Sequence, residues 1–500
     1  MSSFKDEVTT ATREDENLSL VKEGTQEGGI SSVLSMLQEK MGVVDDDRIV
    51  FPEIESGEVP RLFSSLKYSV LEDGKLSARH AAGSVLGAAA LVAGTTVGAG
   101  VLALPSATAA AGFLPSTAAM CVAWTYMTMS GLFIAELSLN RFGETGQPGL
   151  GLLALYESSL GKTWGRVGSA AYFFLHYTVM VAYIAQGGAN FDGFLSSVGM
   201  SSDFHGSGQI AFASLGAVAL YTASQPIVQT VNKVLVAGVF ASFLGIVALG
   251  AGSADFGALI DLSNQHPENV VSAFPILFLS LVYQNIVPTV VMQLEGDRRK
   301  ITAAIIGGTL APLLMYIAWN AVILGNVMGI DPSLLGNVDP VSVLQNNNEE
   351  GAVLGTLVGI FSELALITSL IGFVYGLIDA LTDVAAIPMK GPVFKKYKPA
   401  LFAAVFLPPL ALSIGDPDIF YTALDYGGAF GVSTLFLVLP PFMVWKERYG
   451  KEQKQLTTKP IVPFGKITLG SMWKAAGTLI LEQGAEKLGI FDLFHEHFMS

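Results

Sequence analysis

The sequence V-A-G-T-T-V-G-A-G-V-L-A-L-P, from Val92 to Pro105, lies in the middle of the apolar segment 85–111. A straight helix of this length would measure about 40 Å, which exceeds the roughly 30 Å hydrocarbon core of a bilayer. Three glycines each weaken such a helix by about 1 kcal/mol relative to alanine: Gly94, Gly98 and Gly100. Small residues also permit close helix packing, but the adjacent hydroxyls of Thr95 and Thr96 favour an interrupted helix. Irregular backbone in a membrane must be surrounded by protein or water, so we expect this interruption to line a binding site.

The composition indicates a polytopic membrane protein. Of 500 residues, 51% are hydrophobic and only 14% are charged, with a mean hydropathy of +0.52, whereas soluble proteins contain about 25% charged residues. The net charge of -14 owes much to an acidic N-terminal stretch, and residues 1–80 are predicted to form a soluble, largely disordered tail. This charge balance excludes nucleic-acid binding. The single cysteine, Cys121, excludes a disulfide framework and a thiolate metal site.

Apolar runs of about 20 residues predict ten membrane spans within a transport core at residues 81–447. They lie near 85–111, 116–138, 166–188, 209–225, 229–251, 271–294, 301–326, 352–378, 399–414 and 419–445. Every second connection contains no Lys or Arg, while the others are basic. The positive-inside rule therefore places the basic loops and the N-terminus on the cytoplasmic side, or on the equivalent side of an organelle. Residues 448–500 contain a weaker segment after Lys466, which is either an eleventh span or an amphipathic helix.

A second interruption is predicted in the sixth span, F-P-I-L-F-L-S-L-V-Y-Q-N-I-V-P-T-V, from Phe274 to Val290. Gln284 and Asn285 place two amides at mid-membrane, and Pro288 frees a backbone carbonyl nearby. Two interrupted helices in oppositely oriented five-span halves indicate an inverted-repeat transporter. A half-helix N-terminus near Ala99–Gly100–Val101 fits a carboxylate, and the free carbonyls of the second break fit an ammonium. A ligand with both groups is an amino acid.

Several motifs resemble those of the hydroxy/aromatic amino-acid permeases, the tyrosine- and tryptophan-specific transport proteins of the amino acid–polyamine–organocation superfamily. They are the Val92–Pro105 stretch, F-S-E-L-A-L-I-T-S-L-I-G (361–372), G-L-I-D-A-L-T-D (376–383) and F-L-P-P-L-A (406–411). The resemblance implies an all-α, LeuT-type five-plus-five inverted repeat with eleven spans, which carries an aromatic amino acid together with a proton. The chain departs from bacterial members in span six, where Tyr283-Gln284-Asn285-Ile286 replaces a Phe-His-Gly-Ser stretch. Its final apolar segment is also weaker.

The candidate substrate-binding residues come from both breaks and from one aromatic side chain. They are Thr95, Thr96, Gly98, Ala99 and Gly100 in the first break, Tyr283, Gln284 and Asn285 in the second, and Tyr177 in span three. An aromatic wall at Tyr177 would suit an aromatic ligand, and ordinary helix packing is the alternative. No cofactor and no metal site are expected.

Four residues are candidates for ion coupling: Glu363, Thr368, Ser369 and His176. An acid at the centre of a span costs about 2.5–3.5 kcal/mol, so Glu363 is expected to carry a proton or anchor a cation, unless it makes a structural hydrogen bond. Thr368 and Ser369 resemble hydroxyls that hold sodium in relatives of this fold, against the alternative of bonding to the preceding turn. His176 could shuttle a proton or be a satisfied buried side chain.

Two further acids lie near the ends of predicted spans. Glu136 is expected to have a structural role, for which Arg141 is the nearest partner in the sequence. Asp425, toward the outer side of span ten, is either an additional coupling group or part of the access path.

The functions that remain open are all membrane functions. Proton-coupled symport of tyrosine or tryptophan competes with a sodium-coupled or broader neutral amino-acid transporter. A non-transporting amino-acid sensor, signalling through the acidic tail, is the alternative from another class. The scattered histidines and the lack of a catalytic motif argue against an enzyme. The host membrane is either a plasma or bacterial inner membrane, or a plastid envelope.

Overall fold

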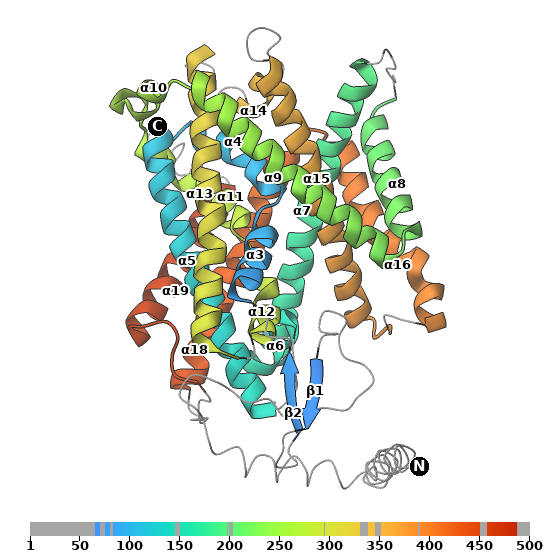
Figure 1. The fold of residues 1–500 in the computed structure, drawn as a ribbon, viewed down its shortest axis with the longest axis vertical. Helices are drawn as coiled ribbons and strands as arrows, with labels where there is room; N and C mark the ends of the chain where they lie inside the picture. The colour runs from blue at the N-terminus through green and yellow to red at the C-terminus, as the bar shows by residue number, and fades with distance from the viewer. Residues whose placement is uncertain are drawn as a thin grey trace, which may run out of the picture.

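The computed structural model describes residues 66–70, 76–80, 84–145, 151–197, 199, 204–294, 296–330, 339–345, 352–388, 391–450 and 458–487. Helices dominate these residues and run along the long axis of the molecule (Figure 1). The all-helical prediction missed an antiparallel hairpin, β1 (Leu66–Val70) and β2 (Leu76–His80), in which Leu66 faces His80 and Val70 faces Leu76. The hairpin falls within residues 1–80, the stretch that was predicted to be a soluble tail.

Within the described residues, eight helices or helical segments are long and apolar enough to cross a membrane, or nine if one bent pair counts as a span. They include α5 (Phe113–Thr145), α7 (Lys162–Ser197), α9 (Gln225–Ser253), α13 (Arg298–Ile330), α15 (Ala352–Val384) and α16 (Gly391–Gly415). Each of the ten predicted apolar runs falls on a helix or on a series of consecutive helical segments. However, α8 (Ser207–Thr222) has only 16 residues, fewer than the about 20 that a spanning helix requires.

The first predicted interruption is confirmed. Helix α3 (Val85–Thr96) starts where the Ser84 hydroxyl caps the amide of Gly87 at 2.9 Å, and it ends at Thr96. Val97 and Gly98 then have extended backbone, before the short 3-10 helix η1 (Ala99–Ala103) and α4 (Leu104–Ala109). The two halves of this span are bent by 50°. Pro105 lies in the first turn of α4, where its missing N–H costs nothing.

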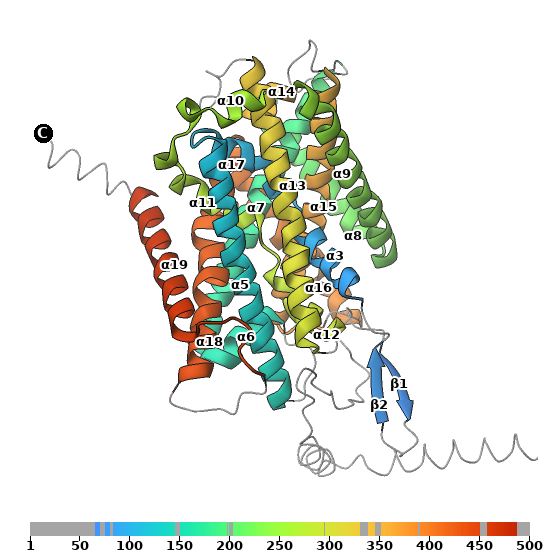
Figure 2. The ribbon, with the colours of Figure 1, turned by 60° about the vertical axis from the view of Figure 1, so that its left-hand side comes forward.

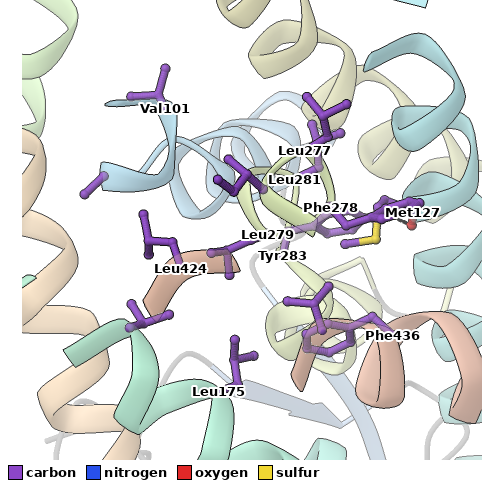
Figure 3. Close-up of a cluster of buried hydrophobic side chains, with 14 of the residues drawn as sticks. Val101, Met127, Leu175, Leu277, Phe278, Leu279, Leu281, Tyr283, Leu424 and Phe436 are labelled. Carbon is purple, nitrogen blue, oxygen red and sulfur yellow. Dashed lines mark hydrogen bonds between the residues drawn. The ribbon is translucent and has the colours of Figure 1, made fainter. Parts of the chain in front are cut away.

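The second interruption is also present. Helix α11 (Phe274–Ser280) ends at Ser280, and a short irregular segment leads to η5 (Gln284–Ile286) and then α12 (Val287–Gln293). Pro288 lies in the first turn of α12 and therefore starts that helix rather than breaking one. A large apolar cluster surrounds α11, with side chains from several other elements, among them Met127 of α5 and Leu175 of α7 (Figure 3). This packing holds the non-helical backbone inside protein, as a membrane interior requires.

The last described helix packs lengthwise beside span ten. Span ten consists of α17 (Phe420–Tyr426), the π-helix η7 (Gly427–Val438) and α18 (Leu439–Tyr449), and α19 (Gly465–Lys487) lies along them (Figure 2). The hydroxyl of Tyr126 on α5 lies between two backbone carbonyls there, 2.9 Å from Leu437 O and 2.7 Å from Met472 O. At the far end of α19, Lys487 forms an ion pair with Asp425 of α17. Asp425, which was predicted to be either an additional coupling group or part of the access path, is thus bound to α19.

A buried ion pair holds the stretch of chain that leads into α19. Arg448 donates from Nε and Nη2 to the two carboxylate oxygens of Glu136, at 2.7 and 2.6 Å, and both side chains are almost completely buried. The backbone amide of Ile461 donates to the same carboxylate at 2.8 Å. The expected pairing of Glu136 with Arg141 is wrong, because Arg141 points to the connecting helix α6 (Leu152–Leu160) and donates to Ser158 O at 2.8 Å. The structural role predicted for Glu136 matches its burial.

Candidate functional site

The two helix breaks touch each other. The hydroxyl of Ser280, the last residue of α11, lies 3.0 Å from the carbonyl oxygen of Gly100 in η1. A Cβ atom at position 100 would lie 3.1 Å from the Ser280 hydroxyl oxygen and 3.3 Å from its Cα. The backbone at position 100 therefore lies closer to Ser280 than a side chain there would permit without a shift of its neighbours. Gly100 thus allows the two breaks to come together.

Ser369 of α15 contacts the first break from the other side. Its hydroxyl oxygen accepts a hydrogen bond from the amide of Ala99 at 2.9 Å, and it lies 3.0 Å from the position of a Cβ on Gly98. The Ala99 amide, predicted as a donor to a carboxylate, is thus engaged by a serine hydroxyl in this conformation. The Val101 amide is likewise engaged, by Gly98 O at 3.2 Å.

The threonine hydroxyls of the first break donate back into α3. Thr95 donates to Leu91 O at 2.9 Å, and Thr96 donates to Val92 O at 2.8 Å. Both protons are used in the preceding turn, a pattern that bends helices and weakens them slightly. The two threonines therefore mark the end of α3, and each hydroxyl keeps its acceptor capacity.

The polar residues of the second break divide between two directions. Tyr283 and Gln284 are fully buried against α5, where the Tyr283 hydroxyl and the Gln284 amide lie 3.1 and 3.2 Å from Met127 O. The Gln284 side-chain oxygen accepts from the Tyr283 amide at 2.9 Å. Gly131 makes room for this arrangement, because a Cβ there would lie 2.0 Å from the Tyr283 hydroxyl oxygen. Asn285, in contrast, is exposed.

The ion-coupling candidates on α15 have different surroundings. Glu363 is half-buried, and its carboxyl group hydrogen-bonds to the side chain of Asn190 on α7. The Thr368 hydroxyl lies 2.9 Å from Leu364 O and 3.0 Å from Ala365 O, as the intrahelical alternative predicted. Ser369, one residue further, is the member of this group that contacts the break.

His176 and Tyr177 on α7 are both held by the protein. The Nδ1 atom of His176 lies 2.8 Å from Tyr172 O, and its ring stacks on Tyr172 with centroids 3.8 Å apart. This matches the alternative of a satisfied buried side chain. The Tyr177 hydroxyl donates to Ala404 O of α16 at 2.9 Å, so its polar end is directed toward that helix.

Comparison with known proteins assigns the chain to a family. Residues 81–471 match the model of the tryptophan/tyrosine permease family. The chain belongs to this family. It is 27% identical to the tryptophan-specific transport protein of Haemophilus influenzae over 375 residues, which cover 73% of this chain and 87% of that protein.

Two other relatives give the same picture of the permease. Tyrosine-specific transport system 2 of Haemophilus influenzae is 28% identical over 375 residues, covering 72% of the permease and 87% of the relative. The low affinity tryptophan permease of Escherichia coli strain K12 is 24% identical over 385 residues, with coverages of 74% and 88%. The chain is therefore a multi-pass membrane transport permease and not an enzyme, as predicted. Among the described residues, no three His, Cys, Asp or Glu side chains gather in a group that could hold a metal ion.

One residue of the permease that contacts both breaks was not predicted from the sequence. Tyr316 lies on α13, and its hydroxyl oxygen is 2.8 Å from Thr96 O and 2.9 Å from Ser280 O. Thr96 and Ser280 are the last residues of α3 and α11, so their carbonyl groups lack partners further along a helix. A buried tyrosine in the middle of an apolar span needs a hydrogen-bond partner. The position of Tyr316 in the sequence was therefore the one feature from which its contact could have been predicted.

Proposed function

We propose that this permease carries an aromatic amino acid, tyrosine or tryptophan, together with a proton by alternating access. The proposed scaffold is a LeuT-type five-plus-five inverted repeat of ten spans, with α3–α4 and α11–α12 as the interrupted helices of the two halves. The α19 helix is the proposed eleventh span, since the ion pair of Lys487 at its end and the contact of Ile461 just before its start hold it along span ten. The printed names of the relatives, which are tryptophan- and tyrosine-specific, support the choice of substrate.

The observation that carries this proposal is the contact between the two breaks. Two helix C-termini, those of α3 and α11, bring backbone carbonyls to one place, and such ends favour a positive charge. The start of η1 lies on the same short segment, and its Ala99 amide, which donates to Ser369 in this conformation, would favour a negative charge once released from that hydroxyl. A zwitterion such as an amino acid matches this pair of opposite partial charges.

The proposed proton carrier is Glu363. It is a half-buried carboxyl group on a predominantly apolar span, where an acid is costly and therefore commonly functional. Its partner is the neutral Asn190, so a change in protonation does not leave an unpaired cation. Sodium coupling, the alternative, would use Thr368 and Ser369. The Ser369 oxygen already accepts a hydrogen bond from the Ala99 amide, which makes this pair the less suitable site.

Gradient-driven uptake into proteoliposomes tests the proposal. Labelled tyrosine and tryptophan are supplied with an inward proton gradient, with an inward sodium gradient and with neither, and unlabelled amino acids compete in a panel. We expect uptake that follows the proton gradient and is lost as concentrative uptake in Glu363→Gln, while exchange of internal for external substrate persists. Uptake that follows sodium alone would overturn the proton coupling. Absence of uptake of both aromatic amino acids would overturn the substrate assignment.

The same assay separates transport from sensing. A variant that lacks residues 1–80 is expected to transport as well as the full chain, because the proposed site lies entirely within the helices from α3 onward. Loss of transport in that variant would favour a function that depends on the tail. The proposed orientation, with the N-terminus on the cytoplasmic or equivalent side, is tested by protease access to the tail in sealed vesicles.

A further inference from the structure

Three helices converge on a single phenol in the middle of the permease. Tyr316 projects from α13 and is 2% exposed. Its hydroxyl oxygen contacts the carbonyl oxygen that ends α3 at 2.8 Å and the one that ends α11 at 2.9 Å. Both contacts link segments that are far apart in the chain, so the phenol joins the two breaks directly.

The hydroxyl of Tyr316 has fewer protons to donate than there are carbonyl oxygens in contact with it. A phenol has one O–H group and can donate fully to only one carbonyl at a time. The other carbonyl then faces an oxygen lone pair, and both carbonyls belong to helix C-termini that carry partial negative charge. The arrangement is therefore one donor short, and it favours a positive charge close by.

An ammonium group meets this need. The two carbonyl oxygens lie within about 6 Å of each other, because each is in hydrogen-bond contact with the same atom. An ammonium has three N–H donors, enough for both carbonyls and for a lone pair of the phenol oxygen. Its charge also suits the two helix ends.

We propose that Tyr316 completes the ammonium site of the substrate, by holding Thr96 O and Ser280 O on one centre and accepting the third N–H. This inference rests on the proposed amino-acid substrate, and it assigns a specific role to a residue of α13. Tyr316 then acts on substrate affinity through the ammonium group and leaves recognition of the aromatic ring unaffected.

The chain offers a matched control. Tyr126 also places a buried phenol between two backbone carbonyls of different helices, at 2.9 Å from Leu437 O and 2.7 Å from Met472 O. These carbonyls lie in η7 and α19, and neither belongs to a residue of the two breaks. The Tyr126→Phe variant therefore loses the same chemical interaction at a place that this proposal does not connect with substrate.

The test is equilibrium binding to purified permease, which does not depend on a gradient. Wild type, Tyr316→Phe and Tyr126→Phe are titrated with tyrosine and tryptophan, and with the analogues that lack the amino group, 3-(4-hydroxyphenyl)propionate and indole-3-propionate. We expect Tyr316→Phe to weaken amino-acid binding about tenfold and to leave analogue binding unchanged. Tyr126→Phe is expected to keep both affinities within about twofold of wild type.

A second variant covers the case in which Tyr316→Phe does not fold. Tyr316→4-aminophenylalanine, introduced by codon suppression, supplies two N–H donors and so satisfies both carbonyls at once, while its nitrogen is a poor acceptor. We expect a folded protein with weakened amino-acid binding. Unchanged amino-acid affinity in both variants, or an equal loss for amino acids and analogues, would show a purely structural role and overturn the inference. Wild type that binds no α-amino acid would instead overturn the proposed function itself.

Discussion

Replacing Glu136 by Gln is expected to destabilise the permease by about 3–5 kcal/mol. The Glu136 carboxylate accepts two hydrogen bonds from Arg448 and one from the amide of Ile461, at 2.6–2.8 Å. The exposed fractions of the two side chains are 2% for Glu136 and 4% for Arg448. Removing the acid therefore leaves a buried guanidinium without its counter-charge, and this cost exceeds that of a surface pair.

A double-mutant cycle measures the interaction itself. Wild type, Glu136→Gln, Arg448→Gln and the double variant are unfolded by titration with SDS in mixed micelles, followed by circular dichroism. We expect the double variant to be more stable than the sum of the single losses predicts, by about 2 kcal/mol or more. The control cycle uses Asp297 and Lys300, a longer pair at 3.5 Å whose lysine side chain is 40% exposed, and there the coupling should remain below about 1 kcal/mol. Equal coupling energies in the two cycles would refute the reasoning.

Two further predictions concern a glycine in the core and an acid in a loop. Gly131→Ala should cost about 1–3 kcal/mol of unfolding free energy, because the added Cβ would overlap the Tyr283 ring. The control Gly94→Ala meets open space and should stabilise α3 by up to about 1 kcal/mol. Similar losses of unfolding free energy in the two variants would contradict this prediction. Asp339 caps α14 (Pro340–Gln345), and burial raises the pKa of its carboxyl group. The contribution of Asp339 to stability is therefore complete below the unfolded-state pKa of about 4, and it is lost as the pH rises through the higher folded-state pKa. Asp339→Asn should therefore flatten the melting temperature between about pH 4 and neutrality, and an unchanged pH profile would argue against it.

Local composition was sufficient to predict where the helices are interrupted. The glycines and threonines of the Val92–Pro105 stretch lower helix propensity over a few residues, and Gln284, Asn285 and Pro288 do the same in the sixth span. Such signals are short-range, and both breaks occur where they lie. Span length was harder to predict, because α8 is shorter than the apolar run that suggested it.

Long-range partners could not be predicted in the same way. Tyr316 and Thr96 are 220 positions apart, and Glu136 and Arg448 are 312 apart. In each case many side chains of the right chemistry were available, and the nearest in sequence, Arg141, was the wrong choice for Glu136. The direction of a side chain is equally hidden, since Gln284 is buried and the adjacent Asn285 is exposed. Only the packing of several helices decides these features.

The ion pair between Asp425 and Lys487 has a consequence for biosynthesis. The acid on α17 is made 62 residues before its partner at the end of α19. During translation Asp425 is therefore without this lysine, and span ten lacks the ion pair, until α19 has been synthesised. A stop codon placed before α19 would thus release a protein in which the Asp425 carboxylate lacks its lysine partner. Membrane quality-control proteases would be expected to degrade such a protein.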